Sequence, residues 1–326
     1  MRLGRRRREA EAETASLFFA TDIHGSERCF RKFLNAAKFY GVGNLVLGGD
    51  ITGKTLVPIE QTQRGFSASL LGHDYVDLDT AERGELEARI RDMGRYPVVG
   101  ERDELDALAD EAHMEEVFCT AVVESMRRWV ELAEERLAGT GIRCFVAPGN
   151  DDYWEIDEAL RGSEVVEFVE GSRVRLDERH EMITTGYSNR TPWDSPRELD
   201  EAELLALLER MYGEVEDPDG LICVFHPPPS GTELDQAPAI DAEFKVVLEN
   251  GEPKMINVGS TAVRKFFLER QPLLGLHGHV HDSRAEQRLG RTLCLNPGSQ
   301  YSEGVLMGAI VRLSDSGIAS NQFVVG

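Results

Sequence analysis

The sequence predicts an α/β fold in which buried strands carry polar residues at their carboxyl ends. Two observations support this fold class. Short apolar runs typical of buried strands each end in Gly, Asp, Asn or His residues. Stretches with the spacing of amphipathic helices lie between these runs. With 326 residues, the chain is long enough for one large domain that carries an insertion.

The expected elements alternate along the chain. Helical spacing marks residues 26–40 and 198–211. The expected strands are the apolar runs at residues 17–21, 45–47, 144–147, 221–225 and 273–276. Because polar groups at the carboxyl ends of sheet strands build the sites of α/β folds, these five strand ends are expected to meet at one crevice.

A long insertion separates the second and third predicted strands. About a hundred residues lie between Asp50 and Asn150, too many for one crossover helix. Residues 56–79 alternate as a hairpin does, and residues 103–138 have a charged, helical pattern. We therefore expect residues 57–140 to form a cap beside the site.

The beginning of the chain is basic. Residues 1–16, with the run Arg5 to Arg8, are expected to be a solvated, disordered tail in front of a domain over residues 17–326. No apolar stretch has the length of a secretion signal or a membrane span. The cysteines are odd in number and never form a CxxC pair, which predicts reduced thiols and a cytoplasmic protein: Cys29, Cys119, Cys144, Cys223 and Cys294.

Charge restricts the partners of this protein. Acidic residues outnumber basic ones by 58 to 36, and the formal net charge is −22. Such a surface repels polyanions, so the composition disfavours nucleic acid and anionic membranes and favours a small-molecule substrate. The composition does not determine the oligomeric state.

Five polar motifs follow the predicted strands in a fixed order. Taken singly, an Asp-x-His or a Gly-Asp pair is a weak signal, because either can be a turn or a cap. The motifs are Asp22-Ile23-His24, Gly49-Asp50, Gly149-Asn150, His226 and Gly278-His279-Val280-His281. Their order is specific, and it resembles that of the calcineurin-like metallophosphoesterases, over about residues 17–310 with the insertion set aside.

The resemblance implies a two-layer β-sandwich flanked by helices (αββα), with two divalent metal ions at the site. It implies that Asp22, His24 and His281 hold one ion. It also implies that Asn150, His226 and His279 hold the other, with Asp50 as the bridge. Imidazole and carboxylate ligands suit Mn, Fe, Zn or Ni ions, so the metal is not identified. A metal-activated water would then attack the phosphoryl group.

Catalysis is expected to involve Asn150, His279 and Asp151. Many members of the family have a histidine directly after the Gly-Asn pair, where this chain has Asp151. An aspartate ionised by nearby dications is a poor proton donor. Substrates whose leaving group needs little help are therefore expected.

Two further segments are candidates for supporting roles. Ser260 and Arg264 could bind phosphate oxygens, or Ser260 could instead cap the helix that follows. The segment Asn296-Pro297-Gly298-Ser299 resembles a turn of prokaryotic single-domain members and is expected to support the His cluster.

The function these features predict is metal-dependent hydrolysis of a phosphodiester or a related small phosphorylated substrate. Phosphomonoesterase or pyrophosphatase activity is the alternative within the same class, and a nuclease is disfavoured by the acidity. A non-catalytic protein-binding scaffold on the same fold is the alternative from another class. It is disfavoured because every ligand position is filled.

Overall fold

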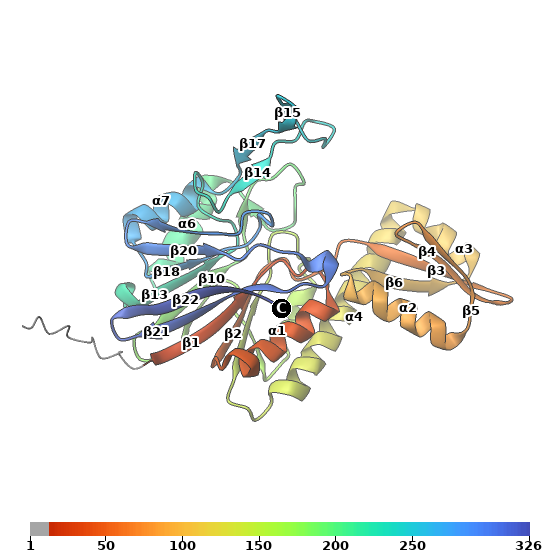
Figure 1. The fold of residues 1–326 in the computed structure, drawn as a ribbon, viewed down its shortest axis with the longest axis horizontal. Helices are drawn as coiled ribbons and strands as arrows, with labels where there is room; N and C mark the ends of the chain where they lie inside the picture. Colours follow the sequence, from red (N-terminus) through yellow and green to blue (C-terminus); the bar gives the residue numbers. More distant parts are fainter. Residues whose placement is uncertain (1–12) are drawn as a thin grey trace, which may run out of the picture.

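The computed structural model describes residues 13–326, and two six-stranded sheets form its centre (Figure 1). In the first sheet, β1, β2, β7 and β8 are parallel, and β21 and β22 are antiparallel. In order across this sheet lie β22 (Gly317–Val325), β21 (Met307–Ser314), β1 (Glu13–Ala20), β2 (Asn44–Gly48), β7 (Arg143–Ala147) and β8 (Val166–Phe168).

The second sheet also has a parallel centre, but it carries an antiparallel strand at each of its two edges. In order across it lie β19 (Ala285–Leu289), β20 (Thr292–Asn296), β18 (Leu274–Leu276), β13 (Leu221–Phe225), β10 (Glu181–Thr185) and β9 (Ser172–Arg175).

The two sheets pack face to face through an apolar core. Leu17 and Phe19 of β1 belong to a buried cluster that also holds Val224 of β13 and Leu276 of β18. The alternate residues of β1, such as Phe18, face a separate cluster on the outer side of the first sheet. Because successive side chains of a strand point to opposite faces, a strand buried on both sides reads as a continuous apolar run.

Helices cover the outer face of each sheet, which gives the four layers of the predicted αββα sandwich. The first sheet is covered by α1 (Glu27–Tyr40), α4 (Glu111–Leu137) and α5 (Ile156–Arg161). The second is covered by α6 (Glu201–Tyr212) and α7 (Thr261–Arg270). Residues 198–199, expected to begin the helix that is α6, instead form β12 (Glu198–Leu199), which pairs with β11 (Ser188–Asn189).

The insertion divides into two structural parts. Its first part is a module at the side of the sandwich (Figure 1) with its own small core, and this part includes the predicted hairpin. The module consists of β3 (Leu56–Thr62), β4 (Gly65–Leu70), β5 (His73–Leu78), α2 (Thr80–Asp92), β6 (Tyr96–Gly100), α3 (Arg102–Asp106) and η1 (Ala107–Ala109).

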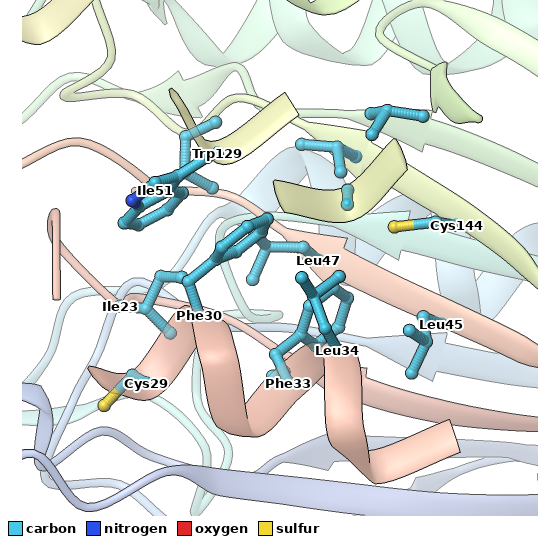
Figure 2. Close-up of a cluster of buried hydrophobic side chains, with 14 of the residues drawn as sticks. Ile23, Cys29, Phe30, Phe33, Leu34, Leu45, Leu47, Ile51, Trp129 and Cys144 are labelled. Atoms are coloured by element: carbon cyan, nitrogen blue, oxygen red, sulfur yellow. The ribbon is translucent and has the colours of Figure 1, made fainter. Parts of the chain in front are cut away.

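The second part, α4, differs from the expectation of a cap over residues 57–140. Its buried residues Val122, Met126 and Trp129 belong to the core between the first sheet and α1. Figure 2 shows Trp129 beside Phe30 of α1, and the two rings stack with centroids 4.2 Å apart. The charged residues of α4 form its solvent face. Because they dominate the sequence pattern, the sequence did not reveal that the opposite face completes the main core.

A narrow arm stands out from the sandwich on the side of α7 (Figure 1). It consists of two small antiparallel pairs, the first being β14 (Gln236–Pro238) with β17 (Met255–Asn257). The second pair is β15 (Leu248–Glu249) with β16 (Glu252–Pro253). Two short 3₁₀ turns complete the described elements: η2 (Pro218–Gly220) and η3 (Tyr301–Glu303).

The ordered fold starts earlier than expected. Residues 13–16, assigned above to the basic tail, are the first half of β1 and pair with β21. The Arg5 to Arg8 run lies outside the described residues. Over residues 13–326, no helix has the length and apolar character needed to cross a membrane.

Trp129 provides a test of the role assigned to α4. We expect Trp129→Ala to lower the free energy of unfolding by about 3–5 kcal/mol, because it empties a packed site against Phe30. Trp193 is 65% exposed, and Trp193→Ala is expected to change stability by about 0.5 kcal/mol or less. Chemical denaturation measures both. A loss from Trp129→Ala as small as that from Trp193→Ala would mean that α4 is not part of the main core.

Candidate metal centre

Polar residues from both sheets converge at the carboxyl ends of their parallel strands. Within each of two groups, one ligand atom from every residue lies within 4.8 Å of those of the others. One group comprises Asp22, His24, Asp50 and His281. The other comprises Asp50, His226 and His279.

Asp50 belongs to both groups and turns one oxygen to each. Its Oδ2 lies 3.7 Å from Nε2 of His24, and its Oδ1 lies 3.3 Å from Nε2 of His226. On the His24 side, the Nε2 atoms of His24 and His281 are 3.0 Å apart, and His281 Nε2 lies 3.4 Å from Oδ1 of Asp22. A carboxylate between two sets of imidazoles has the placement of a bridging ligand.

Asn150 joins the His226 side of the site. Its side-chain oxygen lies 2.9 Å from Nδ1 of His279, and the residue is buried. The structure thus brings together all seven residues that the sequence nominated as ligands: Asp22, His24, Asp50, Asn150, His226, His279 and His281.

Backbone carbonyls fix the orientation of two histidine rings. Nδ1 of His226 donates to the carbonyl of Gly48 at 3.1 Å, so Nε2 is the ring nitrogen that faces Asp50 and is left to bind a cation. His277, the first histidine of the 277–281 run, belongs to neither of the two groups. Its Nδ1 lies 2.8 and 3.1 Å from the carbonyls of Phe225 and Pro227, so it holds the chain on either side of His226.

Burial and charge pairing shift the titration of the site. Burial raises the pKa of Asp22, but its hydrogen bond with His281 and the charge of His226 outweigh burial and lower the pKa to about 2. Burial lowers the pKa of His226, but the negative charge of Asp50 beside it outweighs burial and raises the pKa to about 10. Without a metal ion, these carboxylates favour the protonated imidazoles of His226 and His281. A metal ion must displace those protons to bind.

The donor atoms fit divalent cations. Nε2 of His226 is buried, faces Oδ1 of Asp50 at 3.3 Å and has no hydrogen-bond partner. An orphaned imidazole nitrogen is costly in a buried site, and a cation between this nitrogen and the carboxylates would satisfy it. Mixed imidazole and carboxylate donors suit first-row transition metals.

Four of the residues that form the two groups also have a strained backbone. Asp22, His24, Asp50 and His279 all have positive φ angles, between 37° and 67°. Such conformations cost about 1–3 kcal/mol each in residues other than glycine and concentrate at functional sites. At Gly149, a Cβ atom would clash with the carboxylate of Asp50. Glycine is therefore required there for the two loops to approach.

Asp152 ties two of the site loops together, a role that the sequence did not reveal. Its buried carboxylate accepts hydrogen bonds from the N–H groups of Ile51, Thr52 and Gly149 at 2.7–3.0 Å, and from the hydroxyl of Thr52 at 2.6 Å. These bonds join the loop after Asp50 to the loop that carries Asn150. Arg197, also buried, binds the carbonyls of Asp152 and Tyr153 from the other side.

Asp151 lies at the edge of the site. Its N–H donates to Oδ1 of Asp50 at 3.1 Å, and its Oδ1 accepts from Asn150 and from the hydroxyl of Ser195 at 3.0 and 2.6 Å. Its Oδ2 pairs with the ammonium of Lys54. The sequence analysis missed Lys54 and Ser195. Lys54 follows Asp50 by four residues, which was the one available signal.

Ser260 and Arg264 have structural roles. Ser260 is buried at the start of α7, where its hydroxyl accepts from the N–H of Val263 and donates to Glu201. Arg264 donates to the carbonyls of Ser230 and Gly231. The helix-cap alternative therefore describes Ser260, and Nη1 of Arg264 is bonded within the chain. Phosphate binding by this pair stays a prediction.

The turn at residues 296–299 supports the His cluster as expected. The side-chain amide of Asn296 donates to the carbonyls of Gly278 and Val280, at 3.3 and 3.0 Å. The hydroxyl of Ser299 donates to the carbonyl of Asp22 at 2.6 Å. Tyr301, just beyond the turn, packs on the ring of His24 with centroids 4.7 Å apart.

Comparison with solved structures supports the architecture. One crystal structure aligns over 96% of this chain and 98% of its own, with a TM-score of 0.59 and 15% identity. That of TT1561 from Thermus thermophilus aligns over the same shares, with a TM-score of 0.53 and 12% identity. The chain has the calcineurin-like metallophosphoesterase fold. At these identities the likeness is one of fold.

Sequence comparison adds one relative. The chain is 27% identical over 152 residues to the uncharacterized protein MJ1162 of Methanocaldococcus jannaschii. The match covers 46% of this chain and 61% of that protein, less than two thirds of its length. No protein-family model matches the sequence. The metallophosphoesterase fold therefore rests on architecture and motif order.

Asp152 can be tested separately from the ligands. We expect Asp152→Asn to weaken metal binding by about 10- to 100-fold, because its amide group would face N–H donors and loosen both loops. Titration of the metal-free protein with Mn²⁺ and Zn²⁺, followed by calorimetry, measures this. Glu155→Gln, an exposed change three residues away, should leave the affinity unchanged. If Asp152→Asn bound metal as tightly as Glu155→Gln does, Asp152 would not be needed to hold the two site loops for metal binding.

Proposed function

We propose that this protein is a binuclear metal-dependent phosphoesterase that hydrolyses a phosphodiester or a related small phosphorylated molecule. The observation that carries the proposal is Asp50, whose two carboxylate oxygens face separate imidazole groups. Two divalent ions would be held there. Asp22, His24 and His281 would hold one, and Asn150, His226 and His279 would hold the other.

The chain's own residues hold and orient these groups. When bound, two such ions would polarise a phosphoryl oxygen and lower the pKa of a water that serves as nucleophile. Gly48 keeps His226 in the tautomer that offers Nε2, and the N–H of Asp151 steadies the shared carboxylate of Asp50. Asn150 and His279 would border the reacting phosphate.

Asp151 favours substrates with good leaving groups. Its carboxylate accepts from Asn150 and Ser195 and pairs with Lys54. Both carboxylate oxygens are acceptors in these contacts, so neither is placed to donate a proton to a departing alkoxide. We therefore expect aryl and other activated diesters to be hydrolysed faster than alkyl monoesters.

The module of β3–β6 would act as a cap that restricts which substrates enter. Its base reaches the site loops, since the hydroxyl of Tyr96 accepts the N–H of Gly53 at 2.7 Å. Ser26 in turn donates to the carbonyl of Asp92 at 2.7 Å. A cytoplasmic location is part of the proposal, and it is supported by the five free cysteines.

The bridging role of Asp50 is the first test of this proposal. Purified wild-type protein is expected to bind about two transition-metal ions per chain and to lose hydrolysis on chelation. Asp50→Ala should remove both ions, because each group loses a ligand. Elemental analysis and turnover of a chromogenic diester measure the outcome. Two ions and a near-normal rate in Asp50→Ala would contradict the ligand assignment.

Leaving-group dependence tests the role of Asp151. The rate of the wild-type enzyme should fall steeply as the leaving-group pKa rises across a series of aryl and alkyl esters, since a positioned general acid would supply about 10²- to 10⁴-fold. Asp151→His should flatten that dependence and raise monoester turnover at unchanged metal content. A shallow dependence in the wild type, or loss of an ion in the variant, would instead make Asp151 a ligand or an anchor of one.

A further inference from the structure

Lys54 is held beside the site by a loop that is fixed at several points. The residues before it are bonded, with Thr52 joined to Asp152 and the N–H of Gly53 joined to the hydroxyl of Tyr96. The side chain of Lys54 is 51% exposed, so solvent and solutes reach it. The loop therefore delivers a cation to the edge of the site and leaves it accessible.

Asp151 determines where the ammonium of Lys54 lies. Its carboxylate is itself fixed, by Asn150 and Ser195 on Oδ1, and Oδ2 pairs with Lys54. The N–H of the same residue contacts Asp50. Asp151 thus links the ammonium of Lys54 to Asp50, the residue that faces both groups of candidate ligands.

The ammonium keeps binding capacity in this arrangement. It has three N–H donors, and the pair with Asp151 uses one direction, so donors remain for another acceptor. A half-exposed ion pair contributes little to stability, so stability alone is a poor reason for such a well-fixed lysine.

We propose that Lys54 binds a non-bridging oxygen of the substrate phosphoryl group and that Asp151 positions it there. This inference rests on the proposed function. The aspartate after the Gly-Asn pair then acts by holding a cation from a neighbouring loop, in place of an imidazole of its own. A compact ammonium ion suits a phosphate oxygen and counters the charge that develops there in the transition state.

Substitution of Lys54 tests the inference by two independent measurements. In metal-loaded protein, Lys54→Met should weaken calorimetric binding of inorganic phosphate by at least about tenfold and lower kcat/KM for a chromogenic diester by about 10²-fold. Metal content should not change. Lys54→Arg should restore part of both losses, because it keeps the charge. Lys38→Met, a change at an exposed lysine of α1, is the matched control and should alter neither.

A double-mutant cycle separates binding from positioning. Asp151→Asn should weaken phosphate binding less than Lys54→Met does, and the double variant should be no worse than Lys54→Met alone, because Asp151 acts through Lys54. Additive losses would overturn the positioning role. Wild-type phosphate affinity and turnover in Lys54→Met would overturn the Lys54 inference alone. A wild-type protein that binds neither metal nor phosphate would overturn the proposed function and this inference with it.

Discussion

The face-to-face packing of two parallel-centred sheets is the constraint on which the site depends. Asp22 and Asp50 follow strands of the first sheet, whereas His226 and His279 follow strands of the second. The 3.3 Å separation between His226 and Asp50 is therefore a distance between sheets, maintained by the apolar core that they share. Because a displacement of about 1 Å can cost about 10²-fold in catalysis, the precision of the site depends on that core.

A second requirement is that the loops hold strained residues in place. The positive φ angles of Asp22 and His24 coincide with backbone hydrogen bonds between their loop and the loop after β2, from Asp22 N–H to Gly49 and from His24 N–H to Asp50. Asp152 then ties that second loop to the third. The strain at each ligand is thus supported by its neighbours, so the three loops form one interdependent unit.

Much of this arrangement could be predicted from the sequence because strong local patterns encode it. Buried strands such as β13 appear as apolar runs, and the motif order nominated every residue that the two His and Asp groups contain. The place of α4 could not be predicted, since its polar face dominates its composition while Trp129 and its neighbours complete a distant core. For Ser260 and Arg264 the sequence left phosphate binding and a helix cap as alternatives. Only tertiary contacts reveal that Ser260 caps α7 and that Nη1 of Arg264 binds backbone carbonyls.

Lys54 illustrates why local charge matters in this protein. A net charge of −22 repels an anionic substrate at long range, but the Debye length at physiological salt is about 8 Å, so distant carboxylates are largely screened at the site. The groups within that distance decide whether a phosphate binds. In the proposed function Asp22 and Asp50 would hold cations there, and without those cations they make the site acidic. A lysine that pairs with Asp151 and remains half-exposed adds positive charge at the edge of the site without occupying a proposed ligand position. The proposed role of Lys54 would thereby let an acidic protein bind an anion at one place while the rest of its surface repels polyanions.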